Sequence, residues 1–239
     1  GEWNSGEDLG SFLIEITAQA FGKKDPDTGK DLVDVILDEA GQKGTGKWTT
    51  EAAMDLGIPI LTITAAVDAR IMSGDKGMRE TGKQMPTALN DASADPRELA
   101  AMCRSALELS TILSYVQGFE MIRKASEEHA WNISLTEVAR IWRGGCIIRS
   151  TLLPVFQGAL GDDSEQEKKL LERFAGKRQQ NWRKLLGLTT AQGIPTPALS
   201  ASLAYYDTYR REKLPQNLIQ AQRDLFGAHT FKRRDREGV

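Results

Sequence analysis

Apolar residues recur at three- and four-residue steps along almost the whole chain. Near the start, Leu9, Phe12, Leu13, Ile16 and Ala20 fall on one face of a helix. No segment alternates apolar and polar residues with a period of two over a useful length. The pattern therefore predicts an all-α fold, a helical bundle, without the βα units of a nucleotide-binding domain.

Helix-start and helix-stop residues divide the first part of the chain. A short helix is expected to end at Gly41 as its C-cap, and the next to begin after the capping residues Thr49 and Thr50. An apolar helix is expected over 60–73. Residues 74–95 are rich in Gly, Lys, Asp, Asn and Ser, so they are expected to form an exposed connection.

The longest predicted helix covers about 96–130. Asp95 and Pro96 favour its start, because Pro suits the first helical turn. Ser134 and Glu137 form a capping-box pattern for a helix to residue 142. Further helices are expected over 147–154, 164–174, 176–191, 197–211 and 215–227.

Composition narrows the class of protein. With 239 residues, 40% of them hydrophobic, the chain can bury a core without disulfides or a metal. A net charge of -2 argues against a nucleic-acid surface spread over the molecule, and no apolar run reaches the ~18 residues of a membrane span. Cys103 and Cys146 are expected to be free, buried thiols. This cysteine usage favours a reducing, cytoplasmic compartment.

Residues 41–48 read Gly-Gln-Lys-Gly-Thr-Gly-Lys-Trp, close to a phosphate-binding Walker A loop. The last position of that motif needs a hydroxyl for Mg²⁺, and Trp48 has none, so an NTPase is disfavoured. The glycines still allow a ligand close to the backbone, with Lys43 and Lys47 as cations and Thr45 as a hydroxyl. A phosphate or carboxylate site and a plain solvated turn are equally compatible with these residues.

The run Ile36-x-Asp38-x-x-Gly41-Gln42-Lys43-Gly44-Thr45-Gly46-x-Trp48 resembles the signature of the 6-phosphogluconate dehydrogenase family. Residues 74–98 depart from the family pattern. The resemblance implies that residues 1–239 form the helical substrate-binding and dimerisation domain of a longer chain. It also implies two similar helical repeats, which are not visible in these residues. Other segments resemble the family in the same order: 11–17, 141–150, 218–224 and 226–230.

The resemblance implies the NADP-dependent oxidation of 6-phosphogluconate at C3, loss of CO2, and tautomerisation to ribulose 5-phosphate, without a metal. In the family an N-terminal Rossmann domain binds NADP, and a K-x-x-H-N-x-x-E helix carries the Lys base and Glu acid. Neither that pattern nor G-x-G-x-x-G occurs in this sequence. No catalytic residue is therefore expected in this chain, and the fragment alone is expected to be inactive.

The same resemblance assigns five substrate-binding residues. Lys43 and Thr45 match the family's phosphate-end ligands, and Arg70 matches its guanidinium position, where a planar fork suits a phosphate. Arg223 and His229 match residues that reach the neighbouring subunit's site, so a homodimer is expected. From the residues alone, Arg70 would be a surface ion pair and His229 an ordinary exposed histidine.

Two alternatives belong to different classes. A free-standing helical dimerisation or binding module would lack catalysis, but it would have no need for this set of cationic residues. A related β-hydroxyacid dehydrogenase would have a shorter helical domain without the glycine loop.

Other prominent residues are expected to be structural. Arg143 or Arg149 is expected to hold a buried ion pair, and His129 to lie as a cation near a helix C-terminus. Four tryptophans are expected in the core: Trp3, Trp48, Trp131 and Trp182.

Overall fold

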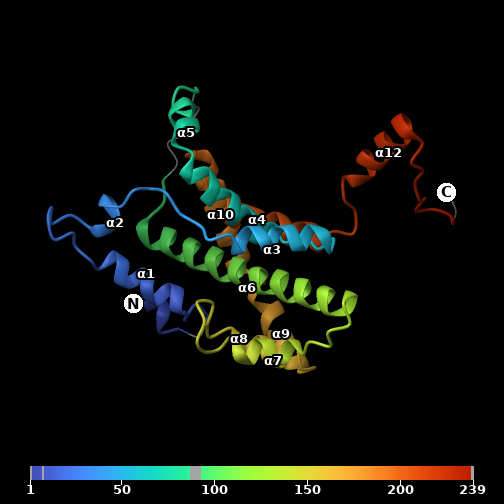
Figure 1. The fold of residues 1–239 in the computed structure, drawn as a ribbon, viewed down its shortest axis with the longest axis horizontal. Helices are drawn as coiled ribbons and strands as arrows, with labels where there is room; N and C mark the ends of the chain where they lie inside the picture. Colours follow the sequence, from blue (N-terminus) through green and yellow to red (C-terminus); the bar gives the residue numbers. More distant parts are fainter. Residues whose placement is uncertain (1, 7, 87–92, 238–239) are drawn as a thin grey trace. The chain divides into compact units, whose positions relative to one another are not determined.

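The computed structural model describes residues 2–6, 8–86 and 93–237 (Figure 1). Within these ranges all regular structure is helical, apart from two isolated bridges that pair Ser11 with Ser150 and Lys24 with Asp31. The all-α prediction is confirmed. The chain divides into two compact units, unit 1 (Gly1–Leu203) and unit 2 (Ala204–Val239).

Unit 1 contains most of the helices, and α11 continues across the boundary into unit 2, which also holds α12. The bounds are η1 (Glu2–Asn4), α1 (Phe12–Phe21), α2 (Leu32–Val35), α3 (Thr45–Asp55), α4 (Leu61–Gly74), α5 (Lys76–Gly82), α6 (Pro96–Glu128), α7 (Leu135–Ile141), α8 (Leu153–Ala159), α9 (Ser164–Arg173), α10 (Lys177–Ala191), α11 (Pro197–Tyr209) and α12 (Gln216–Gly227).

The 33-residue helix α6 runs through the middle of unit 1 (Figure 1). It begins as the sequence predicts, with Pro96 in the first turn and the Asp95 carboxylate accepting hydrogen bonds from the amides of Arg97 and Glu98, at 2.9 and 3.3 Å. Helices α4, α7 and α10 contact α6. Because partners lie on several sides, α6 buries residues around most of its circumference.

The core of unit 1 is built where α6 meets α8 and α10. Phe119 lies between two rings, with centroids 5.2 Å from Trp142 and 5.5 Å from Phe156. Trp182 of α10 is fully buried, as predicted. The same prediction is wrong for Trp48, which is 63% exposed, and it also fails for the exposed Trp131.

A buried polar contact joins three helices of unit 1. Gln117 of α6 accepts a hydrogen bond from the Thr62 amide at 3.0 Å and donates one to Thr62 Oγ1 at 2.9 Å. Thr62 Oγ1 also lies 2.8 Å from Ser202 Oγ of α11. Since all three side chains are buried, these mutual hydrogen bonds satisfy their polar groups and set the register of α4 against α6.

Several predicted helix boundaries are wrong around the glycine loop. Helix α2 ends at Val35, so Gly41 is not its C-cap. Helix α3 begins at Thr45, and Thr49 and Thr50 lie inside it, where their hydroxyls donate to the carbonyls four residues earlier at 2.8 and 3.1 Å. The hydroxyls therefore do not cap the helix.

Two further corrections concern turn residues. The expected connection 74–95 contains helix α5, whose start is capped by Asp75 accepting from the Met78 amide at 2.9 Å; residues 87–92 of that connection lie outside the described ranges. The expected helix over 147–154 is absent, and Pro154 lies in the first turn of α8 instead of ending a helix. Proline lacks an amide hydrogen, which is not needed in a first turn.

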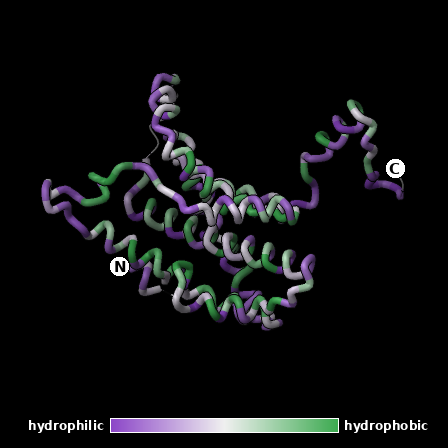
Figure 2. Tube along the Cα trace, in the orientation of Figure 1, coloured by the Kyte–Doolittle hydropathy of each residue, from purple (hydrophilic) through white to green (hydrophobic). Residues whose placement is uncertain are grey.

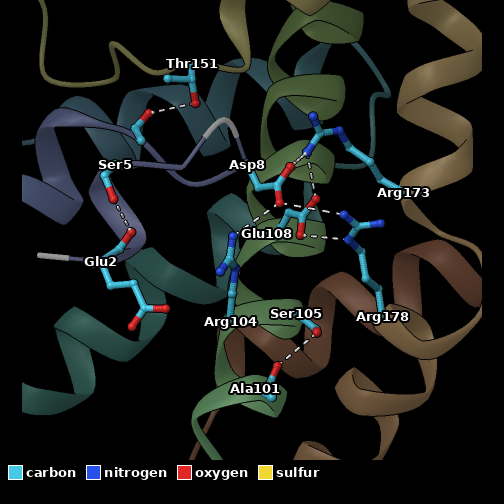
Figure 3. A network of polar contacts seen from close by, with 11 residues as sticks. Glu2, Ser5, Asp8, Ala101, Arg104, Ser105, Glu108, Thr151, Arg173 and Arg178 are labelled. Carbon is cyan, nitrogen blue, oxygen red and sulfur yellow. Dashed lines mark hydrogen bonds and ion pairs between the residues drawn. The ribbon is translucent and has the colours of Figure 1, made fainter.

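A network of half-buried charged side chains around the buried Glu108 connects four segments of unit 1 (Figure 3). Glu108 of α6 is 2% exposed, and its carboxylate accepts from Arg173 at 2.8 Å and from Arg178 at 3.2 Å. Arg173 also bonds Asp8 at 2.6 Å, and Arg104 lies 3.3 Å from the same carboxylate. Burial alone would raise the pKa of Asp8, but the hydrogen bond from Arg173 and the surrounding guanidinium charges outweigh it and lower that pKa.

The prediction that Arg143 or Arg149 holds a buried ion pair is therefore wrong, because the buried carboxylate of Glu108 pairs with Arg173 and Arg178. Arg143 is exposed and donates to Gln157 at 3.2 Å. The Arg149 guanidinium lies 3.8 Å from the centre of the Phe12 ring and donates to the carbonyl of Cys146. Sequence inspection missed Glu108 because its partners are 65 and 70 residues away.

The cysteines and His129 lie close to where the sequence places them. Cys103 and Cys146 are free but only half-buried, and burial raises the pKa of the Cys103 thiol. His129 directly follows the last residue of α6, so its predicted place at a helix C-terminus is confirmed, and its ring stacks on Trp131 with centroids 4.7 Å apart. Among the helices of the described ranges, none is long and apolar enough to cross a membrane.

Candidate functional site

The glycine loop leads directly into the N-terminus of α3. Gly44 has a φ of 94°, a left-handed conformation that favours glycine, and it occupies the N-cap position without a side-chain cap. A Cβ on Gly46 would lie 2.7 Å from Val67 Cγ2, so α3 approaches α4 closely there. The first-turn amides of α3 therefore meet no capping side chain, which is the usual arrangement of an anion site at a helix N-terminus.

Arg70 of α4 lies against the start of this loop, where its guanidinium donates to the Gly41 carbonyl. The neighbouring Ala40 amide donates to Ser73 Oγ at 2.9 Å, and Ser73 Oγ donates to the Arg70 carbonyl at 2.7 Å. These contacts hold residues 40–41 beside the C-terminal half of α4. The structure thus brings Arg70 to the loop that contains Lys43 and Thr45.

The charges around the loop are unevenly compensated. Lys76 pairs with Glu39 at 3.5 Å, Arg79 pairs with Asp38, and Lys47 pairs with Glu51 at 3.4 Å. The Arg79 hydrogen bond keeps the pKa of Asp38 below its ordinary value. Lys43 and Arg70, both exposed, have no carboxylate partner in the described part of the chain. The surface ion pair that the residues alone suggested for Arg70 is therefore absent from the described part of the chain. The positive charges of Lys43 and Arg70 are left without a carboxylate partner there and could face a ligand.

Arg223 and His229 lie in unit 2, on α12 and directly after it. A turn with left-handed residues at Ala228 and Thr230 folds the chain back on α12. Two hydrogen bonds fix it: Asp224 accepts from the Thr230 amide at 2.8 Å, and Gln220 donates to the Thr230 carbonyl at 2.6 Å. The turn places His229 with its ring centre 5.7 Å from that of Phe226.

Both of these side chains are exposed and have only local contacts. Arg223 donates to Gln220 at 3.1 Å, one helical turn away, and neither Arg223 nor His229 has an ion-pair partner within residues 204–237. Unit 2 by itself thus presents a cation and an imidazole on one short segment. Apolar and polar positions are interleaved along α12 (Figure 2), and no residue of α12 is buried.

The chain was compared with known proteins. The model of the 6-phosphogluconate dehydrogenase C-terminal domain matches residues 1–239. The chain belongs to this family. The resemblance drawn from the glycine loop is confirmed.

The curated relatives that match this chain are named as 6-phosphogluconate dehydrogenases. The NADP(+)-dependent, decarboxylating 6-phosphogluconate dehydrogenase of Bacillus subtilis is 47% identical over 244 residues, covering 100% of this chain and 52% of that protein. The decarboxylating enzyme of Synechocystis is also 47% identical, covering 99% of this chain and 50% of that protein. The chain therefore spans about half the length of the curated relatives it matches.

A solved structure matches the fold. Plasmodium falciparum 6-phosphogluconate dehydrogenase, studied in its apo form and in complexes with NADP+ and with 6-phosphogluconate, superposes with a TM-score of 0.90 at 43% identity. The match covers 99% of this chain and 52% of that one. The helical architecture is thus the architecture of the family's C-terminal domain.

Proposed function

We propose that this chain is the substrate-binding and dimerisation domain of an NADP-dependent, decarboxylating 6-phosphogluconate dehydrogenase. The whole protein would convert 6-phosphogluconate and NADP+ to ribulose 5-phosphate, CO2 and NADPH in the cytoplasm. Family membership supports the proposal, as do the activity named for the Bacillus subtilis relative and the substrate complex of the Plasmodium falciparum enzyme.

The observation that carries the proposal is the uncompensated positive charge at the start of α3. Lys43 and Arg70 would neutralise the substrate phosphate, Lys43 as a point charge and Arg70 through its planar fork. The Thr45 hydroxyl and the first-turn amides of α3 would donate the remaining hydrogen bonds. In this role the domain holds and orients the substrate.

The described residues do not fit a dinucleotide site, which needs a strand, a glycine-rich loop and a helix in succession. The regular elements of the described residues are all helices, and the sequence has no G-x-G-x-x-G loop. NADP would therefore be bound mainly by the other half of the longer protein, with the acid and base. No hydride or proton-transfer step is assigned to this chain, and the domain alone should not turn over substrate.

The homodimer is the second part of the proposal. Arg223 and His229 would enter the neighbouring subunit's site, Arg223 at the phosphate and His229 on the sugar-acid chain. Neither side chain has an ion-pair partner within residues 204–237, which supports this role. The exposed apolar residues of α12, among them Leu225 at 88% and Phe226 at 75% exposure, also require a covering surface.

Calorimetric titration of the 239-residue chain with 6-phosphogluconate tests the proposal, with the oligomeric state measured by light scattering. A dimer should bind 6-phosphogluconate saturably and bind gluconate, which lacks the phosphate, much more weakly. Lys43→Ala and Arg223→Ala should each weaken binding by about 1.5–3 kcal/mol, the value of a charge-assisted hydrogen bond.

The matched control is Lys184→Ala, because Lys184 is an exposed lysine of α10 already paired with Glu98 at 3.4 Å. It should leave binding unchanged. Equal affinity for gluconate and 6-phosphogluconate would contradict the phosphate site. A folded dimer whose longer protein shows no turnover with substrate and NADP+ would instead support the alternative, a helical dimerisation module without catalysis.

A further inference from the structure

The segment between α2 and α3, residues 36–44, contains no helix, and its middle part is held against α4 and α5. Four consecutive residues, 38–41, each contact one of these two helices, and we call them the strap. The contacts pair Asp38 with Arg79, Glu39 with Lys76 at 3.5 Å, the Ala40 amide with Ser73 at 2.9 Å, and the Gly41 carbonyl with Arg70. Each step of one residue along the strap corresponds to a step of three residues back along the helices, about one turn. The strap therefore follows α4 and α5 in the reverse direction, in a fixed register.

The contacts of the strap differ in what they can hold. The two ion pairs at its start are exposed, so each fixes the chain only weakly. The Ser73 hydroxyl instead makes two directional hydrogen bonds, since it accepts from the Ala40 amide at 2.9 Å and donates to the Arg70 carbonyl at 2.7 Å. Ser73 lies three residues after Arg70, on the same side of α4. Together with the bond from Arg70 to Gly41, these contacts close a ring around the base and the tip of the arginine side chain.

The other end of the glycine loop is anchored to the same helix. A Cβ on Gly46 would lie 2.7 Å from Val67 Cγ2, so the backbone of Gly46 packs directly on α4, one turn before Arg70. Lys43 and Thr45 lie between the two anchors. The place of Arg70 relative to Lys43 therefore depends on the contacts at both ends of the loop.

We propose that Ser73 is a positioning residue for the phosphate site, because it holds the strap and so keeps the Arg70 guanidinium beside the glycine loop. Arg70 donates to Gly41 through Nη2, and the other donors of its planar fork stay available to an anion. An arginine that is already held loses less side-chain entropy on binding than a free one. The inference deepens the proposed function and rests on its assignment of Arg70 to the substrate phosphate.

The test uses the longer protein with Ser73→Ala, which removes the bridging hydroxyl from a half-exposed position. The dissociation constant for 6-phosphogluconate, measured by titration calorimetry, should rise about two- to tenfold. In steady-state turnover the KM should rise with it while kcat stays nearly constant, because only binding of the phosphate end is weakened. A loss of folded protein would instead lower kcat and leave KM unchanged. Ser73→Thr keeps a hydroxyl at this position and should restore the affinity.

A second comparison asks whether Ser73 acts through Arg70. In the Arg70→Ala background, Ser73→Ala should cause no further loss of affinity, because the guanidinium that it positions is gone. The same weakening with and without Arg70 would overturn the proposal. An unchanged affinity in Ser73→Ala alone would also overturn it.

The matched control is Thr81→Ala, because the Thr81 hydroxyl is exposed and donates within α5, to the Gly77 carbonyl at 3.1 Å. It should leave the affinity for 6-phosphogluconate unchanged. A loss as large as that of Ser73→Ala would contradict a specific role for Ser73, since removal of any hydroxyl near the strap would then be sufficient.

Turnover is measured separately, so the two proposals can fail separately. Turnover by the longer protein, with independent losses in the Ser73 and Arg70 variants, overturns only the positioning role. Coupled losses of binding without turnover overturn only the proposed function. The same set of variants titrated with inorganic phosphate tests the positioning role even if 6-phosphogluconate itself does not bind.

Discussion

Unit 1 contains two clusters of positive side chains that differ in what faces them. In the first, Arg104, Arg173 and Arg178 surround the carboxylates of Asp8 and Glu108 (Figure 3). In the second, Lys43 and Arg70 lie at the glycine loop, where the Arg70 guanidinium donates to the Gly41 carbonyl and neither side chain has a carboxylate partner among the described residues. The first cluster is half-buried and compensated, whereas the second is exposed and uncompensated.

The difference shows which cluster is available to a ligand. A buried guanidinium with a carboxylate partner contributes to the fold, and removing one partner leaves an isolated charge. An exposed cation without a partner contributes little to folding, because water solvates it, and it can bind an anion at small cost. The predictions below separate folding effects from binding effects.

The largest expected effect is on folding. Glu108→Ala removes a carboxylate that is 2% exposed and breaks its ion pairs with Arg173 and Arg178, which both still face Asp8. The free energy of unfolding should fall by about 3 kcal/mol, at the lower end for broken buried ion pairs because Arg178 is partly exposed. Urea denaturation measures it. Glu98→Ala, which breaks the exposed pair with Lys184, should cost less than about 1 kcal/mol. Equal losses would mean that the buried network does not stabilise unit 1.

The second effect is on binding. Arg70→Ala should weaken 6-phosphogluconate binding by about 1.5–3 kcal/mol, because a charged donor to the phosphate is lost. The free energy of unfolding should change little, since Arg70 is exposed. Titration calorimetry and urea denaturation of the same variant measure the two quantities. A large loss of stability with intact binding would assign Arg70 to the fold and not to the site.

A smaller effect is expected from Thr45→Val, which keeps the side-chain shape and removes the hydroxyl. Binding of 6-phosphogluconate should weaken by about 0.5–1.5 kcal/mol, the net value of one hydrogen bond. Thr49→Val is the control, because the Thr49 hydroxyl donates within α3 to the Thr45 carbonyl. If both variants bind like the unmodified chain, Thr45 does not contact the ligand.

The smallest effect concerns pH. The pKa of Asp8 is lowered in the folded state from the ordinary value of 3.8, so its charge contributes stability above pH 3.8 that is lost as pH falls through the folded-state pKa. Asp8→Asn should therefore be less stable at pH 7, by roughly 1 kcal/mol for this partly exposed pair. The gap should close below pH 3.8. Urea midpoints across pH measure it, and a gap independent of pH would exclude a role for the carboxylate charge.

The two clusters were not equally predictable from sequence. Lys43 and Thr45 were found because the glycine loop is a short contiguous pattern, and the family it indicated is confirmed. Glu108 gave no such signal, since it lies among apolar residues of α6 and its arginine partners come from α9 and α10. The roles of Lys43 and Thr45, like those of Arg70, Arg223 and His229, stay predictions.

By itself the sequence determined the helical class, the start of α6 at Asp95 and Pro96, and the cap of α7, where Ser134 accepts from the Glu137 amide at 3.3 Å. These features depend on residues within a few positions of one another, so spacing and capping chemistry reveal them. Tertiary structure alone decided that Pro154 begins a helix, that Trp48 is exposed and that Arg70 contacts Gly41. Burial and ion pairing depend on which distant segments meet, and that is decided when the helices pack.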